Sequence, residues 1–286
     1  MSDLAKQFDS SSSWKGHLQL EYQQRGSRTV ISRRRQIGPL NVQRPFYPEE
    51  AVCHTYLLHP PGGVVAGDSL KVDIKSLGNS RALVTTPGAT KFYRSLGKTA
   101  YVDQQLQIED GAMLEWLPQE NIFFPGSQAQ INTDIHLQGS ARCIAWEMQC
   151  FGRPALQERF STGCILGRTR VYRDNKLVLN ERLAKQGFDQ HQSCAGMRDY
   201  PMLATMIISS DDTQLFESLN ESLQKINAGI SPKRLILGIT CVDGLIVVRA
   251  MAVYSEDILR AYVKMWQITR EHWFGVIPLA PRIWAT

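Results

Sequence analysis

The sequence predicts a mainly β protein that acquires two α-helices only in its last third. Between residues 17 and 183 apolar and polar residues alternate, and a turn rich in Gly or Pro follows about every ten to fifteen residues. A period of two is typical of strands with one buried face, and this region lacks a strong helical period. Many short strands joined by turns favour a sandwich, a barrel or a β-helix-like stack, and the alternation alone leaves all three open.

The individual strands follow from the same alternation. Leu18, Leu20 and Tyr22 share one face of the first strand. Comparable patterns predict strands at residues 70–74, 81–86, 99–108, 112–117, 129–137, 141–150, 165–173 and 176–183. In the last third, strands are predicted at residues 203–209, 234–241 and 244–252.

Two helices are predicted between and after these last strands. Asp211 and Asp212 precede a segment in which leucine recurs every fourth residue, at Leu215, Leu219 and Leu223. A second helix is expected to begin at Ser255, because Glu256 and Asp257 place acidic side chains in its first turn. Its apolar stripe, which we expect to face the core, comprises Ile258, Tyr262, Trp266 and Trp273.

Size and composition limit the possible classes of protein. The 286 residues are 43% hydrophobic, which is enough for a buried core. An excess of 32 basic over 27 acidic residues gives a net charge of +5, too small to indicate a nucleic-acid-binding protein. No apolar run approaches the roughly 20 residues that span a bilayer. We therefore expect neither a nucleic acid nor a membrane as a partner.

We expect residues 15–286 to form one β-rich domain, preceded by a flexible tail over residues 1–14. The start of the chain is polar and rich in serine, unlike a secretion signal. Residues 186–201 are irregular and polar but do not make a convincing linker. The six cysteines are scattered without a Cys-x-x-Cys motif, which favours reduced thiols and a cytoplasmic protein.

A local concentration of positive charge occurs at Arg33, Arg34 and Arg35. In an alternating strand Arg33 and Arg35 point to the same face. The first interpretation is a solvated sheet edge, because charged side chains protect edge strands from unwanted pairing. A docking surface for an acidic protein partner is the second, and a nucleic-acid surface is the third.

No tight metal site or catalytic motif stands out in the chain. His54 and His59 are five residues apart in an extended segment, so they point to opposite faces and make a poor pair of ligands. No nucleophile elbow or other local signature marks a cysteine or histidine as reactive. Convergent imidazole or thiolate groups, which a tight transition-metal site requires, are not indicated.

Acidic residues occupy strand positions where the pattern predicts burial. Glu181 shares its strand face with three leucines, and Glu147 lies on a face of small and polar residues, opposite a bulky apolar face. Glu115 lies in a strand that is apolar on both faces, whereas Asp134 is expected on the solvent-facing side of its strand.

Buried carboxylates require compensation inside the protein. Removing an ionised carboxylate from water costs several kcal/mol, so three would cost on the order of 10 kcal/mol, comparable with the stability of a whole domain. One interpretation is a network of salt bridges, for example with Arg153 or Lys91. The other is a hydrated internal passage lined by carboxylates and hydroxyls, whose oxygens hold a transition-metal ion more loosely than imidazole or thiolate does.

Three segments rich in glycine and proline are the most distinctive part of the chain: residues 38–50 (GPLNVQRPFYPEE), 59–68 (HPPGGVVAGD) and 85–95 (TTPGATKFYRS). They are followed by residues 115–120 (EWLPQE), 122–126 (IFFPG), 146–147 (WE) and 151–154 (FGRP). Together these segments resemble the UreD (also called UreH) family of urease accessory proteins. The resemblance extends from about residue 14 to residue 284.

The resemblance implies a stacked-sheet, β-helix-like fold and a protein that is not an enzyme. Members of this family bind the urease apoprotein and a UreF-type helical accessory protein, which recruits a UreG-type nickel-carrying GTPase. The family further implies that Ni²⁺ reaches the urease active site through the interior of this assembly. We therefore expect a nickel-insertion scaffold that handles Ni²⁺ transiently and has no tightly bound cofactor.

The resemblance also implies which side chains line the route, namely Asp68, Thr90, Glu147 and Glu181. The strand pattern independently indicates the last two, whereas Glu115 comes from the pattern alone and is the weaker candidate. This chain departs from the family at Ala66, where other members often have glycine. If that position requires a positive φ, the turn that presents Asp68 is shifted here.

Two other functions are compatible with the same residues. A β-rich hydrolase would use a carboxylate pair such as Glu147 and Glu181 as general acid and base, and a cleft with one raised carboxyl pKa favours that function. A plain interaction module would keep its buried acids in closed internal pairs. An enclosed passage between two protein-binding faces favours the scaffold.

Overall fold

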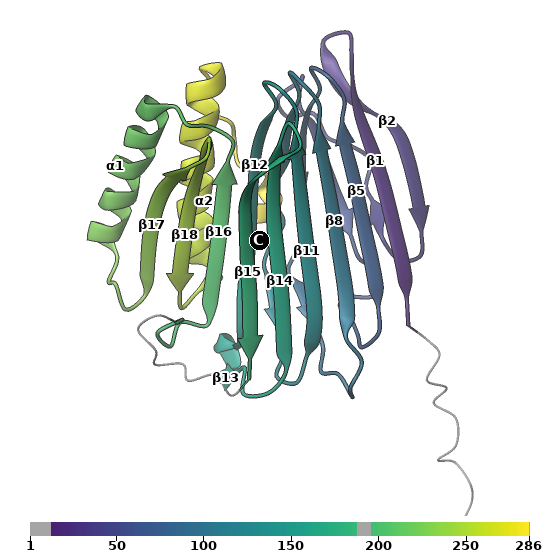
Figure 1. The fold of residues 1–286 in the computed structure, drawn as a ribbon, viewed down its shortest axis with the longest axis vertical. Helices are drawn as coiled ribbons and strands as arrows, with labels where there is room; N and C mark the ends of the chain where they lie inside the picture. The colour runs from purple at the N-terminus through teal and green to yellow at the C-terminus, as the bar shows by residue number, and fades with distance from the viewer. Residues whose placement is uncertain (1–12, 188–195, 286) are drawn as a thin grey trace, which may run out of the picture.

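The computed structural model describes residues 13–187 and 196–285, whose strands form two stacked sheets (Figure 1). The expected tail over residues 1–14 therefore lies mostly outside the described residues, and so does much of the irregular segment 186–201. Among the described residues, no helix has the length and apolar character required to cross a membrane.

The first sheet contains seven strands in the order β15-β14-β11-β8-β5-β1-β2. Five of them run parallel, and β2 and β15 close the two edges as antiparallel partners. The bounds are β1 (Lys15–Arg25), β2 (Arg28–Ile37), β5 (Ser69–Ser76), β8 (Ala100–Ile108), β11 (Gln128–Leu137), β14 (Cys164–Arg173) and β15 (Lys176–Gln186).

The second sheet follows the order β17-β18-β16-β12-β9-β6-β4-β3. Short strands extend it, because β10 pairs with β12 and β7, and β13 pairs with β12. The bounds are β3 (Asn41–Val42), β4 (Cys53–Leu58), β6 (Arg81–Thr85), β7 (Thr90–Phe92), β9 (Met113–Trp116), β10 (Asn121–Phe123), β12 (Arg142–Arg153), β13 (Glu158–Arg159), β16 (Met202–Ile208), β17 (Leu235–Val242) and β18 (Leu245–Ala252).

The chain alternates between the two sheets as it advances. β5, β8 and β11 belong to the first sheet, and each is followed by a strand of the second sheet, namely β6, β9 and β12. Each such pair makes one coil of a solenoid-like stack, and successive coils add parallel neighbours to both sheets. The predicted mainly β, β-helix-like fold is therefore confirmed, and the separate antiparallel region β16–β18 follows the last coil.

The two predicted helices cover the second sheet near β16, β17 and β18, as the left side of Figure 1 shows. Helix α1 (Thr213–Gly229) begins as expected, because the Asp212 side chain accepts a hydrogen bond from the Leu215 N–H at 2.8 Å. Helix α2 (Ser255–Phe274) buries its predicted stripe, although Trp273 is only partly buried. The described residues also form two short 3₁₀-helices, Pro154–Leu156 and Arg282–Ala285.

Two cores result from this layering, and together they fix where the acidic residues lie. One core fills the space between the two sheets and contains Leu20, Ile74 and Leu106. The other lies between the second sheet and the helices and contains Trp146 and Trp266. Because neighbouring residues of a strand point to opposite faces, Trp146 faces the helices while Glu147 faces the space between the sheets.

Candidate functional site

Glu147 lies in the middle of β12 and receives hydrogen bonds from hydroxyls of the opposite sheet. Thr133 of β11 donates to its Oε1 at 2.5 Å, and Thr169 of β14 donates to its Oε2 at 3.0 Å. Among the described residues, no Lys, Arg or His nitrogen lies within ion-pair distance of this carboxylate. In the described part of the chain, Glu147 is therefore held by hydroxyl groups and has no ion-pair partner.

This environment raises the pKa of Glu147 above its ordinary value. Burial is the main cause, and the negative charge of Glu181 adds to it. The two threonine hydroxyls oppose the rise because they stabilise the ionised form. Because a metal ion binds only the deprotonated carboxylate, binding to a carboxyl group with a raised pKa is linked to proton release.

Glu181 lies on β15, directly opposite Thr169 in the strand register. Its carboxylate pairs with the Arg249 guanidinium from β18, and its side chain is 23% exposed. Arg249, Thr205 and Glu147 occupy matching positions on three neighbouring strands of the second sheet. The two glutamates therefore face each other across the space between the sheets, one paired with a cation and one held by hydroxyls.

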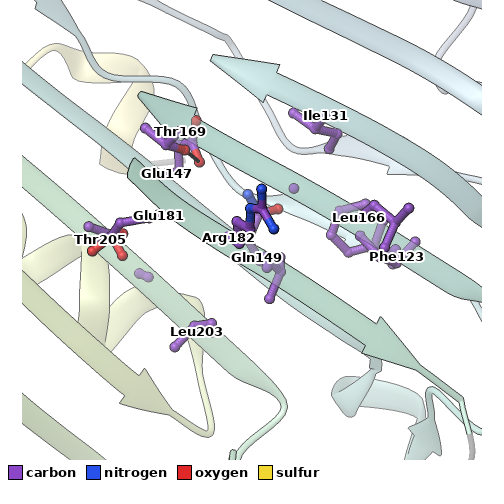
Figure 2. Close-up of a pocket in the computed structure, with 14 residues that line it drawn as sticks. Phe123, Ile131, Glu147, Gln149, Leu166, Thr169, Glu181, Arg182, Leu203 and Thr205 are labelled. Carbon is purple, nitrogen blue, oxygen red and sulfur yellow. Dashed lines mark hydrogen bonds between the residues drawn. The ribbon is translucent and has the colours of Figure 1, made fainter. Parts of the chain in front are cut away.

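A cavity of about 80 Å³ brings these groups together, and we name it the Glu181 cavity (Figure 2). Its polar lining comprises Glu147, Gln149, Thr169, Glu181, Arg182 and Thr205. Since one water molecule needs about 10–15 Å³, the volume is sufficient for several. The apolar remainder of the wall includes Phe123 and Leu166.

A second cavity of about 70 Å³ adjoins the first, and we name it the Thr90 cavity. Glu147 and Ile131 line both cavities, so these two residues lie where the cavities meet. The other polar residues of the Thr90 cavity are His59, Thr86, Thr90, Gln104, Gln119 and Asn121. Three of the four side chains that the resemblance assigns to the route, Thr90, Glu147 and Glu181, therefore lie on adjoining cavities.

Asp68, the fourth of these side chains, lines neither cavity. Its Oδ1 accepts a hydrogen bond from the Trp14 N–H at 2.8 Å, its Oδ2 accepts one from the Val65 N–H at 2.9 Å, and the residue is 1% exposed. The positive φ in this turn, +87°, occurs at Gly67 and not at Ala66. The condition for a shifted turn is therefore not met, and Ala66 fits without strain.

Glu115 is enclosed on the other side of the second sheet, facing α2. It is completely buried, its Oε1 accepts from Trp266 Nε1 at 2.5 Å, and its Oε2 accepts from Arg270 Nη1 at 2.8 Å. Arg270 also pairs with Glu49, which is hydrogen-bonded to His54 at 2.8 Å. For Glu115 the geometry is that of a closed ion pair, and the residue lines neither cavity.

The arginine run lies on β2, at the free edge of the first sheet. As the alternation predicts, Arg33 and Arg35 share a face, where they line a groove of about 570 Å³ with Lys71 and Lys75. Arg34 is on the other face and donates to the Gln36 side chain at 2.7 Å. All three arginines are exposed, so both faces of β2 are accessible to a partner here.

Sequence reasoning missed several residues that shape the site. The hydroxyls of Thr133 and Thr169 lie on otherwise apolar strand faces, and this irregularity was a usable signal. The cation Arg249 carried no such signal, because it lies 68 residues from Glu181. The suggested cation partners are wrong, since Arg153 pairs with Glu158 and Lys91 is exposed.

Within residues 13–187 and 196–285, no three His, Cys, Asp or Glu side chains gather closely enough to hold a metal ion. The polar groups of the two cavities are instead distributed along the space between the sheets. Most of these polar groups are carboxylates, hydroxyls and amides, and oxygen donors of this kind bind first-row transition-metal ions weakly.

Comparison with known proteins identifies the family of this chain. The family model for "UreD urease accessory protein" matches residues 15–285. Proteins named urease accessory protein UreD include one from Aliivibrio fischeri, 47% identical over 281 residues that cover 97% of this chain and 98% of that protein. One from Escherichia coli is 45% identical over 277 residues, covering 97% and 99%, and one from Klebsiella aerogenes is 40% identical over 273 residues, covering 96% and 97%. The chain belongs to the UreD family of urease accessory proteins.

Proposed function

We propose that this protein is a non-catalytic, cytoplasmic nickel-insertion scaffold. It binds the urease apoprotein and connects it, through a UreF-type helical accessory protein, to a UreG-type nickel-delivering GTPase. Ni²⁺ is its cargo and passes between the two sheets through the Glu181 cavity and the Thr90 cavity. The observation that carries this proposal is the position of Glu147, which lines both cavities and has no ion-pair partner among the described residues.

The chemistry of the lining supports transient handling of the ion. A passage has to bind its cargo strongly enough to admit it and weakly enough to release it. Carboxylate and hydroxyl oxygens meet this requirement for Ni²⁺ better than thiolates do. The raised pKa of Glu147 fits the same role, because cation binding to this carboxyl is linked to proton release to water, and cation departure to proton uptake from water.

Cavity size weighs against the hydrolase alternative. The raised pKa of Glu147 beside Glu181 is the one observation that favours acid–base catalysis. However, cavities of about 70 and 80 Å³ are well below the roughly 300–1,000 Å³ of pockets that bind small organic substrates. A hydrated metal ion fits these spaces and a sugar or peptide does not.

The decisive experiment measures urease activation at limiting nickel in cells that express Glu147→Leu or Glu181→Leu variants. We expect both variants to fold, to co-purify with the urease apoprotein and to yield severalfold less active urease. Excess nickel should restore part of the activity, because a weakened passage still conducts at higher concentration. Glu217→Leu, which removes an exposed glutamate of α1, is the matched control. Full activation by both cavity variants at limiting nickel contradicts the passage.

Binding to the partners is a separate part of the proposal. Co-purification of the chain with urease apoprotein, with and without the helical partner, tests it directly. Loss of binding in the Arg33→Glu/Arg35→Glu double variant, with Arg34→Glu as the control on the opposite face, would locate an acidic partner at the β2 edge. Unchanged binding in the double variant leaves those arginines as protection of a free sheet edge.

A further inference from the structure

His59 is a polar residue of the Thr90 cavity whose imidazole has an unsatisfied nitrogen. Nε2 of His59 is buried and has no hydrogen-bond partner among the described residues. His17, His54 and His272, by contrast, each lie within ion-pair distance of a carboxylate. Buried polar groups almost always have a partner, so an unpartnered nitrogen beside a cavity indicates an exchangeable one, either water or a metal ion.

A second unpartnered nitrogen lies on the same cavity. Trp116 is 3% exposed, lines the Thr90 cavity, and its buried Nε1 also lacks a hydrogen-bond partner in the described chain. An indole N–H can only donate, so its natural partner here is the oxygen of water. The χ2 torsion of histidine is broad, so the imidazole of His59 can turn a nitrogen toward the cavity that it already lines. Together the two residues give the Thr90 cavity two nitrogen atoms that are free to bind a water molecule or an ion.

His59 and Glu147 act at different places along the two cavities. His59 follows β4 directly, and the sheet order places β6 and β9 between β4 and β12. Three interstrand spacings of about 4.8 Å separate the two backbones by roughly 14 Å. With backbones this far apart, an ion that moves through the cavities meets the two side chains at different places.

The electrostatic setting of His59 suits a nitrogen ligand. Burial lowers its pKa, and the nearby negative charge of Asp68 opposes this effect. A neutral imidazole has a free lone pair, which is the form that binds metal ions. The role of Asp68 is then indirect, because its own oxygens are held by backbone N–H groups while its charge acts on His59.

We propose that His59 is a nitrogen-donor station, that is, a transient binding site, on the metal route and that it discriminates Ni²⁺ from Mg²⁺ and Ca²⁺. This inference rests on the proposed passage. A lining of oxygen atoms alone does not discriminate well, because carboxylates and hydroxyls suit Mg²⁺ and Ca²⁺ as well as transition-metal ions. A single imidazole adds a ligand that favours Ni²⁺, and one nitrogen is too few to retain it.

The test measures the NMR signal of the His59 imidazole in the full chain, labelled with ¹⁵N at its histidines. Paramagnetic Ni²⁺ at substoichiometric concentration should broaden the His59 signal, whereas Mg²⁺ in excess should leave it in place. The signal is assigned by its absence in His59→Gln, which should also weaken Ni²⁺ binding by roughly tenfold or more without changing Mg²⁺ binding. His136→Gln is the control, because His136 stacks on Tyr172 on the outer face of the first sheet.

The possible outcomes separate this inference from the proposed function. A His59 signal that Ni²⁺ does not broaden, or that Mg²⁺ perturbs equally, overturns the station at His59, and the unaltered chain suffices for that measurement if the variant does not fold. If Glu147→Leu impairs urease activation but Ni²⁺ does not broaden the His59 signal, the passage stands and the station at His59 does not. If Glu147→Leu activates urease fully and Ni²⁺ broadens the His59 signal, His59 binds the metal ion but the passage is contradicted.

Discussion

Arg270 of α2 and Glu115 of β9 form a buried ion pair across 155 residues of sequence, with 2.8 Å between Nη1 and Oε2. Glu115 is completely buried and Arg270 is 5% exposed. Glu49 binds the same guanidinium, so one cation compensates two carboxylates. Burial raises the pKa of Glu115, and the charge of Arg270 opposes the rise. This pair anchors the C-terminal helix to the second sheet.

Removing the cation should therefore destabilise the fold strongly. We expect Arg270→Met to lower the free energy of unfolding by about 3–5 kcal/mol, because a buried charge without a partner is costly. The measurement is urea denaturation followed by fluorescence. Arg260→Met is the control on the same helix, since Arg260 is exposed and pairs with Asp257 only at 3.8 Å. We expect its effect to be small.

Removing both members of the pair should cost less than removing the cation alone. In Glu115→Leu/Arg270→Met the apolar side chains replace the pair, and no uncompensated charge remains at Glu115. We expect much of the lost stability to return. A double variant that is less stable than Arg270→Met would contradict the view that the buried charge, and not lost packing, dominates the effect.

The pH dependence of stability should report the raised pKa of Glu147. A carboxyl with a raised folded-state pKa contributes stability below its ordinary pKa of 4.5, and this contribution is lost as the pH rises through the folded-state value. The stability of Glu147→Gln relative to the parent should therefore increase as the pH rises above 4.5. Each unit of elevation corresponds to about 1.4 kcal/mol. Thermal melts across this range are the measurement, and a difference that stays constant contradicts the prediction.

The hydroxyl of Thr169 should limit the pKa of Glu147. A hydrogen bond from Thr169 stabilises the ionised carboxylate, so Thr169→Val should raise the pKa of Glu147 further. A ¹³C titration of the glutamate side chain measures this change. Thr162→Val, which alters an exposed threonine before β14, should leave the Glu147 titration unchanged. Equal titration in both variants would show that Thr169 does not stabilise the ionised form.

Two glycines near Thr90 should respond differently to substitution. A Cβ at Gly63 would lie 2.3 Å from the Tyr93 ring and 2.9 Å from the Lys91 carbonyl oxygen, so Gly63→Ala has to displace β7. We expect a loss of about 1–3 kcal/mol. A Cβ at Gly88 meets nothing within 4 Å, and Gly88→Ala should be neutral or slightly stabilising. Thermal melts compare the two, and an equal loss in both variants would refute the role of the close contact.

Alternation along a strand was sufficient to orient Glu147. Its neighbour Trp146 is a bulky core residue, so the opposite direction follows from the period of two. The same alternation does not predict which face Glu115 points to, because β9 lies between the two cores and is buried on both faces. A strand of this kind carries no directional signal, and only the position of α2 shows that Glu115 belongs to the helix side.

Partners across long sequence distances could not be predicted. Asp134 lies on the predicted outer face, yet it is only 6% exposed because Arg170 covers it with two hydrogen bonds. The expected solvent exposure of Asp134 was therefore wrong, although its direction was right. Arginine side chains can bury a neighbouring carboxylate at a sheet surface, and the strand period does not reveal this.

The alternation of the chain between two sheets also affects the order of assembly. Glu147 lies 14 residues from Thr133 and 22 from Thr169, so these contacts close short loops. The ion pair between Arg270 and Glu115 can form only after α2 has been synthesised. We therefore expect the surroundings of Glu147 to form while the chain is still on the ribosome. The helices should pack against the second sheet last.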